Sequence, residues 1–264
     1  MDSTKLSVWA LRCGTTDSKY WSCQLPTVAG CHQGRFDGMR PIILSSVSFL
    51  FVAVSVLLGT QDGFASDANA VGCPDYDVSF ARGTGEAPGV GSVGGAFIDA
   101  LTSRVQGKGI DVYAVDYSAN LDPNLSQTGN GTNDLTDHIE RVAALCPSTK
   151  FVIGGYSQGA AVVDMLLSGN PLRDAYVRPL PQALDQRIAA VALFGNPANG
   201  QLRPSDLDLS IRDGLGPKII DICNPRDIAC DPAGGNLDSH VTYGIDGSAQ
   251  HAAQFASQQL LSRS

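Results

Sequence analysis

The sequence predicts an α/β fold, a three-layer sandwich in which helices cover both faces of a central five-stranded parallel sheet. Short apolar segments alternate along the chain with segments whose apolar residues recur at helical spacing. This alternation is typical of parallel sheets, whose strands are buried on both faces and joined by helical crossovers. One apolar segment also runs directly into a G-x-S-x-G pattern and then into a helical pattern.

Five short apolar segments have the length and composition of buried strands. They span residues 76–81, 110–115, 150–155, 188–194 and 218–222. Functional sites on parallel sheets lie beyond the carboxyl ends of the strands. The residues that follow these segments are therefore the first candidates for a site.

Four further segments place their apolar residues on one helical face, as expected for helices that pack on the sheet. These faces comprise Phe97, Ala100, Leu101 and Val105; Ile139, Val142, Ala143 and Cys146; the run from Ala160 to Leu167; and Ala252, Phe255, Ala256 and Leu260. The predicted domain spans residues 71–264, which is long enough for one well-packed core.

The G-x-S-x-G pattern, Gly155 to Gly159, predicts a nucleophilic serine at residue 157. Strand, G-x-S-x-G and helix form the context of a nucleophile elbow, in which small residues let the strand and the helix pass closely. Ser157 would then lie at the carboxyl end of the sheet, beside the positive end of the next helix.

A serine nucleophile needs a histidine base, and the chain contains four histidines. His32 lies in the N-terminal segment, and His138 precedes the serine on what we interpret as a solvated helix face. His251 falls inside the C-terminal helix, where a surface histidine is the simpler interpretation. His240 lies in a polar loop just before that helix, so we predict that it is the base.

The histidine in turn needs an orienting acid, which in this chain order should lie between Ser157 and the base. Asp227 follows the last predicted strand, inside the segment Cys223–Cys230. A disulfide across that segment would rigidify the loop that holds the acid. We therefore predict that Asp227 is the acid, with Asp221 and Asp231 as alternatives.

An oxyanion hole needs preorganised N–H groups, and one usually comes from the residue after the nucleophile, here Gln158. The second should come from the loop that follows the first strand, residues 82–86. Thr84 in this loop offers both an amide and a hydroxyl group. We predict that Thr84 and Gln158 form the oxyanion hole.

The N-terminal part of the chain resembles a secretory signal that begins at residue 39. Met39-Arg40 precedes an apolar stretch at 42–58, and Ala68-Asn69-Ala70 supplies an A-x-A cleavage site. We therefore predict a signal peptide at 39–70, preceded by an extension (1–38) from a misassigned start. The alternative is an uncleaved membrane anchor.

Removal of the first 70 residues leaves four cysteines, an even number that suggests two disulfides in an exported domain. Three pairings are possible. Cys223 and Cys230 are close enough to close a small ring, which leaves Cys73 with Cys146. The net charge of −8, without clusters of Lys or Arg, argues against nucleic-acid binding.

Four motifs in this order resemble the cutinase family of serine esterases, particularly its actinobacterial branch. They are Phe80 to Thr84, Gly154 to Ala160, the C-x-x-x-D-x-x-C segment Cys223–Cys230, and His240 to Gly244. Phe194 to Pro197 fits the same branch. The resemblance implies a compact α/β-hydrolase without a lid domain, two disulfides and ester hydrolysis. It also maps the triad onto Ser157, Asp227 and His240, and the oxyanion hole onto Thr84 and Gln158.

These observations together predict a secreted or cell-wall-associated monomeric esterase of short- to medium-chain acyl esters. It would use no metal or organic cofactor, act on an acyl-ester or lipid substrate, and contact lipid or the cell envelope peripherally. The alternatives are a phospholipase or thioesterase, an envelope acyltransferase, and a non-enzymatic lipid-binding protein. An intact triad argues against the last, because binding alone does not need one.

Overall fold

The structure, a computed structural model, describes residues 72–121, 126–168, 177–200 and 209–262. All of these residues belong to one compact unit, 61–264. The predicted extension at 1–38 and signal peptide at 39–70 lie outside the described residues. Within the described ranges, no helix is both long and apolar enough to cross a membrane.

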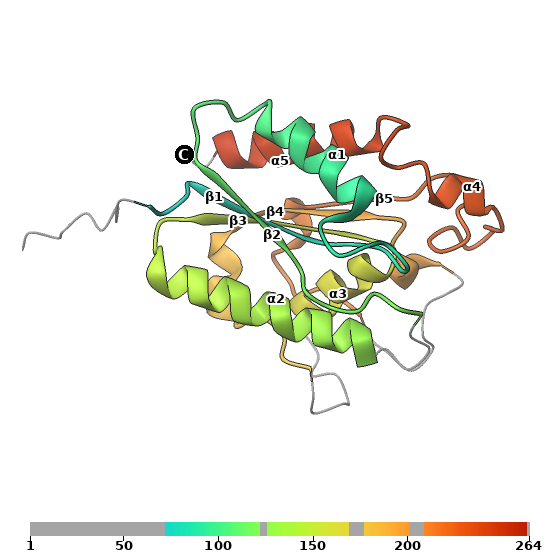
Figure 1. The fold of residues 1–264 in the computed structure, drawn as a ribbon, viewed down its shortest axis with the longest axis horizontal. Coiled ribbons are helices and arrows are strands. Elements are labelled where there is room, and N and C mark those ends of the chain that lie inside the picture. The colour runs from blue at the N-terminus through green and yellow to red at the C-terminus, as the bar shows by residue number, and fades with distance from the viewer. Residues whose placement is uncertain (1–71, 122–125, 169–176, 201–208, 263–264) are drawn as a thin grey trace, which may run out of the picture. The chain divides into compact units, whose positions relative to one another are not determined.

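One parallel sheet forms the centre of the domain, with strand order β2-β1-β3-β4-β5 (Figure 1). The strands are β1 (Tyr76–Ala81), β2 (Ile110–Ala114), β3 (Lys150–Tyr156), β4 (Ile188–Phe194) and β5 (Ile219–Ile222). Every residue of β1 and β4 is buried, because helices cover both faces of the sheet. The predicted five-stranded parallel sheet is therefore confirmed.

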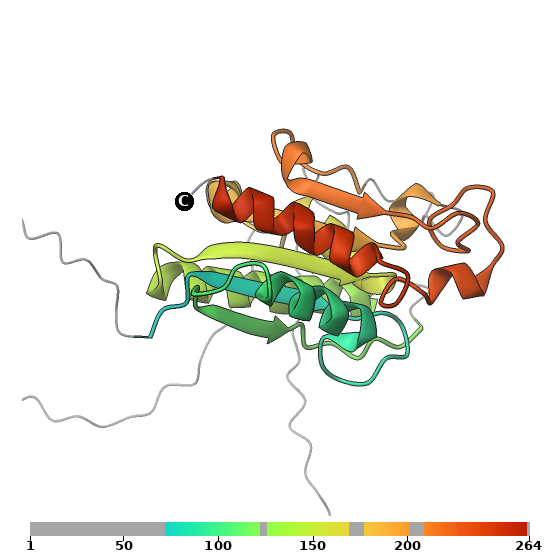
Figure 2. The same cartoon turned by 90° about the horizontal axis from the view of Figure 1, so that it is seen from above.

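Two helices cover each face of the sheet, which completes the predicted three layers. α1 (Gly91–Thr102) and α5 (Ser248–Leu261) pack side by side on one face, as Figure 2 shows from above. α2 (Ser126–Leu145) and α3 (Gln158–Leu167) contact each other on the opposite face (Figure 1). The remaining helices are the short α4 (Leu237–His240) and three 3₁₀ turns, Gln182–Arg187, Pro197–Asn199 and Gly216–Lys218. Among the described residues there is thus no separate lid domain.

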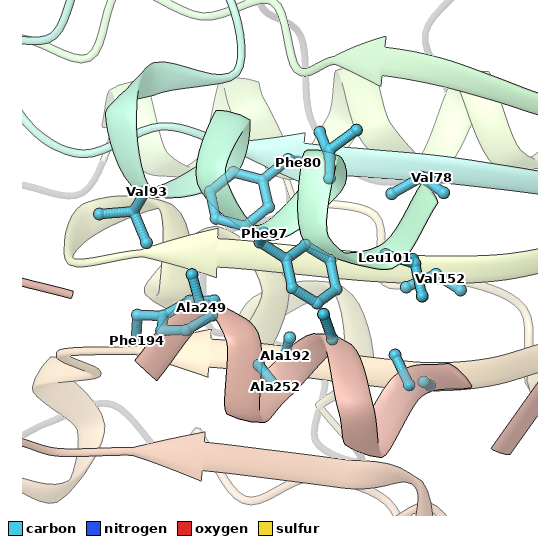
Figure 3. Packing of buried hydrophobic residues seen from close by; sticks show 14 of the residues in the cluster. Val78, Phe80, Val93, Phe97, Leu101, Val152, Ala192, Phe194, Ala249 and Ala252 are labelled. Atoms are coloured by element: carbon cyan, nitrogen blue, oxygen red, sulfur yellow. The ribbon is translucent and has the colours of Figure 1, made fainter. Parts of the chain in front are cut away.

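A hydrophobic core lies on each face of the sheet. Beneath α1 and α5, the rings of Phe80, Phe97 and Phe194 form a cluster with centroids 6.1–6.2 Å apart (Figure 3). Small residues of α5, such as Ala249 and Ala252, let that helix approach the cluster closely. Burial of each large apolar side chain contributes about 1.5–3 kcal/mol. The core therefore holds α1 and α5 firmly against the strands.

α3 also buries a carboxyl group, Asp164, which is 1% exposed. Its Oδ2 atom has no hydrogen-bond partner among the described residues. Burial and the nearby Asp221 raise the pKa of Asp164 to about 8, although a hydrogen bond with Asn196 lowers it. The folded protein therefore keeps a proton that an unfolded chain loses near pH 4.

Replacing Asp164 with asparagine is expected to stabilise the protein more at pH 8 than at pH 4. Between these values the folded state holds more protons than the unfolded state, so wild-type stability falls as the pH rises. Asparagine matches the protonated carboxyl in shape and does not titrate. We expect a gain of at least about 1 kcal/mol at pH 8, or about 2–4 °C in Tm. Thermal unfolding across this range measures it, with Asp99→Asn on the exposed side of α1 as control. A gain that does not change with pH would contradict the assignment.

Candidate active site

The carboxyl ends of four strands bring the predicted site residues to one edge of the sheet. The register pairs Ala81 with Gly155, Tyr156 with Phe194, and Phe194 with Ile222. The segments that follow β1, β3, β4 and β5 therefore begin side by side. These segments carry Thr84, Ser157, Gly195 and Asp227.

Ser157 lies in a tight turn between β3 and α3. Its backbone has φ 55° and ψ −118°, a conformation that costs energy for a residue with a side chain. The turn is held because the Ser157 amide donates to the Phe194 carbonyl at 2.9 Å. A Cβ on Gly155 would collide with the backbone of Gly159, and one on Gly159 would collide with Ala81. Glycine is therefore required on both sides of the serine.

His240, at the end of α4, links the serine to the acid. Its Nε2 atom lies 2.8 Å from Ser157 Oγ, and its Nδ1 atom lies 2.8–2.9 Å from both carboxylate oxygens of Asp227. The imidazole packs against Gly195, where a Cβ would lie 2.9 Å from its Cε1 atom. The phenol of Tyr156 donates to the His240 carbonyl at 2.8 Å. The histidine is thus fixed through both its ring and its backbone.

Asp227 is fully buried and accepts hydrogen bonds on both oxygens. The amide of Ala229 donates to Oδ1 at 2.6 Å, and the phenol of Tyr243 donates to Oδ2 at 2.6 Å. Burial raises the pKa of Asp227, but the hydrogen bonds from Tyr243, His240 and Ala229 outweigh burial and hold the pKa below its usual value. The carboxylate is therefore charged beside the imidazole near neutral pH.

Two disulfides join the cysteines in the pairing that the spacing suggested. The Cα atoms of Cys223 and Cys230 are 5.8 Å apart, and those of Cys73 and Cys146 are 5.6 Å apart. The chain-entropy model assigns about 2.5 kcal/mol to the small ring and about 4.4 kcal/mol to the long loop. The small ring encloses Asp227, the predicted acid, and restricts the local backbone around that residue.

Thr84 and Gln158 lie next to each other beside the serine. The Thr84 hydroxyl donates to Gln158 Oε1 at 3.0 Å, and Gln158 Nε2 donates to the Asn120 carbonyl at 3.1 Å. The backbone amide of Gln158 lies in the first turn of α3, where N–H groups have no partner within the helix. Such an amide can donate to the oxyanion that forms when the Ser157 hydroxyl attacks a carbonyl group.

The loop that carries Thr84 is fixed by two charged side chains. Arg82 is buried and donates to the carbonyl groups of Glu86, Val115 and Tyr117. The Glu86 carboxylate accepts from the Gly83 amide at 2.7 Å and from the Ser92 amide at 2.8 Å. Arg82 and Glu86 therefore preorganise the loop, a role that had not been predicted for either residue from the sequence.

The alternative acids and base occupy other surroundings. Asp221 accepts hydrogen bonds from Asn196 and Asn199 at 3.0 and 2.8 Å. Asp231 accepts from the backbone amides of Arg226 and Ala233 at 2.7 and 2.9 Å. His251 lies on the exposed side of α5. Of the three candidate acids, Asp227 is the one whose described hydrogen bonds include a histidine.

The interpretation of His138 as a solvated helix-face residue is wrong. Its side chain is buried, and Nε2 lies 2.8 Å from Asp77 Oδ2. The ring stacks on Tyr113 at a centroid distance of 3.6 Å. Asp77 also accepts from Ser79 Oγ, so His138 belongs to a polar cluster between α2 and the sheet.

This chain is similar to several known proteins. A family model described as Cutinase matches residues 72–260. The phospholipase Culp4 of Mycobacterium tuberculosis is 40% identical over 87% of this chain and 97% of its own length. The probable carboxylesterase Culp3 of the same species is 43% identical, over 80% of this chain and 79% of its own.

A solved structure extends the comparison to the fold. The cutinase of Trichoderma reesei, in complex with a phosphonate inhibitor, is 32% identical with a TM-score of 0.56, covering 71% of this chain and 77% of that one. The family model spans nearly all of the described domain, and the structure has the sheet that the likeness requires. This chain therefore belongs to the cutinase family and is a carboxylic ester hydrolase.

Proposed function

We propose that this enzyme hydrolyses short- to medium-chain acyl esters through an acyl-enzyme on Ser157, with His240 and Asp227 completing the triad. One observation carries the proposal: a continuous hydrogen-bond chain from Ser157 Oγ through both nitrogens of His240 to the buried Asp227 carboxylate. This arrangement supplies a nucleophile, a base beside it and an acid that fixes the tautomer of the base.

The reaction follows from the positions of these atoms. His240 Nε2 takes the hydroxyl proton of Ser157 as Oγ attacks the ester carbonyl. The imidazolium that forms is stabilised by Asp227 and then protonates the leaving alcohol. In the second half of the reaction His240 takes a proton from water, and the hydroxide attacks the acyl-enzyme. When the bond to Ser157 Oγ breaks and the carboxylic acid is released, the imidazolium of His240 returns that proton to Ser157 Oγ.

The oxyanion of each tetrahedral intermediate would be stabilised by the Gln158 amide and by Thr84. Removal of one such donor typically lowers kcat by about 10²–10³-fold. The Thr84 hydroxyl donates to Gln158 Oε1, so it must rotate to reach an oxyanion. The loop that Arg82 and Glu86 fix holds Thr84 beside Gln158, the residue that follows the proposed nucleophile.

A short to medium acyl optimum is expected in a series of p-nitrophenyl esters. No separate lid domain is present among the described residues, so soluble esters should reach Ser157 without an interface. Each buried methylene contributes about 0.8 kcal/mol, so the optimum reports the length of the acyl groove. Measurement of kcat/KM below and above micelle formation tests this. A sharp rise at the micelle boundary with a long-chain optimum would contradict it.

Hydrolysis of lipid esters at a surface is a second candidate, favoured by exposed apolar side chains on the segments that carry Asp227 and His240. These side chains are Ile228, Leu237, Val241 and Ile245, the last 86% exposed. Such a concentration is typical of surfaces that contact lipid or protein. The relative named a phospholipase supports the same candidate. The ester series across the micelle boundary separates the two functions.

We also propose that the enzyme is exported and cleaved after Ala70. The support is the apolar stretch at 42–58 followed by an A-x-A site, together with two disulfides, which form in oxidising compartments. Intact-mass measurement of protein from the culture medium should give a chain that begins near Val71. A product that keeps residues 42–58 would instead indicate a membrane anchor.

A further inference from the structure

Tyr243 contacts the proposed catalytic acid more closely than its place in the sequence suggests. Its phenol is completely buried and donates to Asp227 Oδ2 at 2.6 Å. The phenol oxygen of Tyr243 in turn accepts a hydrogen bond from the Asn224 amide at 2.9 Å. The segment Cys223–Cys230, which contains the proposed acid, therefore bonds the phenol through both Asn224 and Asp227.

The direction of this hydrogen bond is set by charge. Asp227 is ionised and can only accept, so the phenol must donate. Burial, followed by the hydrogen bond to Asp227, raises the pKa of Tyr243, which keeps the phenol protonated. A neutral phenol next to a buried carboxylate forms one of the strong, charge-assisted hydrogen bonds.

Asp227 Oδ2 is shared between two donors, the phenol of Tyr243 and Nδ1 of His240. Negative charge that the phenol withdraws from the carboxylate is not available to stabilise a proton on the imidazole. In the part of the chain that the structure describes, the titratable groups shown in contact with His240 are Asp227, Tyr156 and Tyr243. Of these two phenols, that of Tyr243 donates to the Asp227 carboxylate, whereas that of Tyr156 donates to the backbone carbonyl of His240.

We propose that Tyr243 is a positioning residue that orients the Asp227 carboxylate and tunes the strength of His240 as a base. The inference rests on the proposed triad and adds to it a fourth member that acts through the acid. It assigns Tyr243 no contact with the substrate.

The test compares Tyr243→Phe with Tyr156→Phe, since each removes one phenol oxygen from a buried ring near His240. The acid limb of the kcat/KM–pH profile reports the protonation of the catalytic base in the free enzyme. In Tyr243→Phe the carboxylate keeps more charge for the imidazolium, so we expect the limb to move up by about 0.5–1 pH unit and kcat to fall about tenfold. In Tyr156→Phe we expect a lower Tm and an acid limb at the wild-type pH.

A second variant keeps the test decisive if Tyr243→Phe fails to fold. Incorporation of 3-fluorotyrosine at position 243 retains the phenol and makes it a stronger donor, so the acid limb should move down. An unmoved limb in either folded variant would overturn the proposal and reduce Tyr243 to a packing residue. Failure of the triad itself would be recognised separately, as full activity in Ser157→Ala.

Discussion

Replacing Ser157 with alanine is expected to abolish ester hydrolysis while the domain stays folded. The hydroxyl is the only group of this residue within hydrogen-bond distance of His240, at 2.8 Å. Loss of the nucleophile in a serine hydrolase costs about 10⁶-fold in kcat, and the remaining rate comes from binding and the oxyanion hole. Alanine retains the Cβ at φ 55°, so the backbone strain is unchanged. The loss of one hydrogen bond costs only about 1 kcal/mol of stability.

The measurement is p-nitrophenyl ester hydrolysis together with labelling by a fluorophosphonate probe. Wild-type protein should be labelled at Ser157, and the alanine variant should be neither labelled nor active. Ser103→Ala, on an exposed serine after α1, provides the matched control and should behave as wild type. Wild-type activity in Ser157→Ala would overturn the triad. A folded wild-type protein that the probe does not label would favour a lipid-binding function instead.

The elements of the fold could be predicted because their signals are local. Each strand is a short run rich in apolar residues, which indicates a strand directly, although the edge strands β2 and β5 are only partly buried. The nucleophile elbow was equally local, since β3, the glycines and α3 follow one another directly. Chain order and the ring Cys223–Cys230 then reduced the choice of acid and base to a few residues.

The parts that the sequence analysis missed depend on contacts between distant residues. His138 lies on a helix face with polar neighbours, and nothing near it in sequence indicates that Asp77, 61 residues earlier, is its partner. The bond between Tyr243 and Asp227 spans 16 residues and a change of chain direction. The one sequence feature that pointed to this bond is that Tyr243 follows His240 by three residues, and in the structure the two rings lie close together.

Exchange of Asp227 for asparagine should lower kcat by about 10⁴-fold, because the amide can force the wrong tautomer on the base. In the wild-type protein both carboxylate oxygens of Asp227 accept hydrogen bonds. Ala229 donates to one oxygen, Tyr243 donates to the other, and His240 Nδ1 lies between them. An asparagine has one accepting oxygen, which the backbone amides of the ring already occupy. Its NH₂ group would then face His240 Nδ1 and donate to it.

A histidine that accepts at Nδ1 carries its proton on Nε2, toward Ser157, and cannot take the serine proton. The defect should therefore appear in kcat, and it should be partly relieved at high pH, where the serine can lose its proton to hydroxide. Steady-state kinetics from neutral to alkaline pH measure both effects, with the exposed Asp238→Asn as control. A loss smaller than about tenfold would transfer the role of the acid to Asp221 or Asp231. That outcome would be hard to reconcile with the hydrogen bonds of the site, because the described partners of those two carboxylates are asparagines and backbone amides.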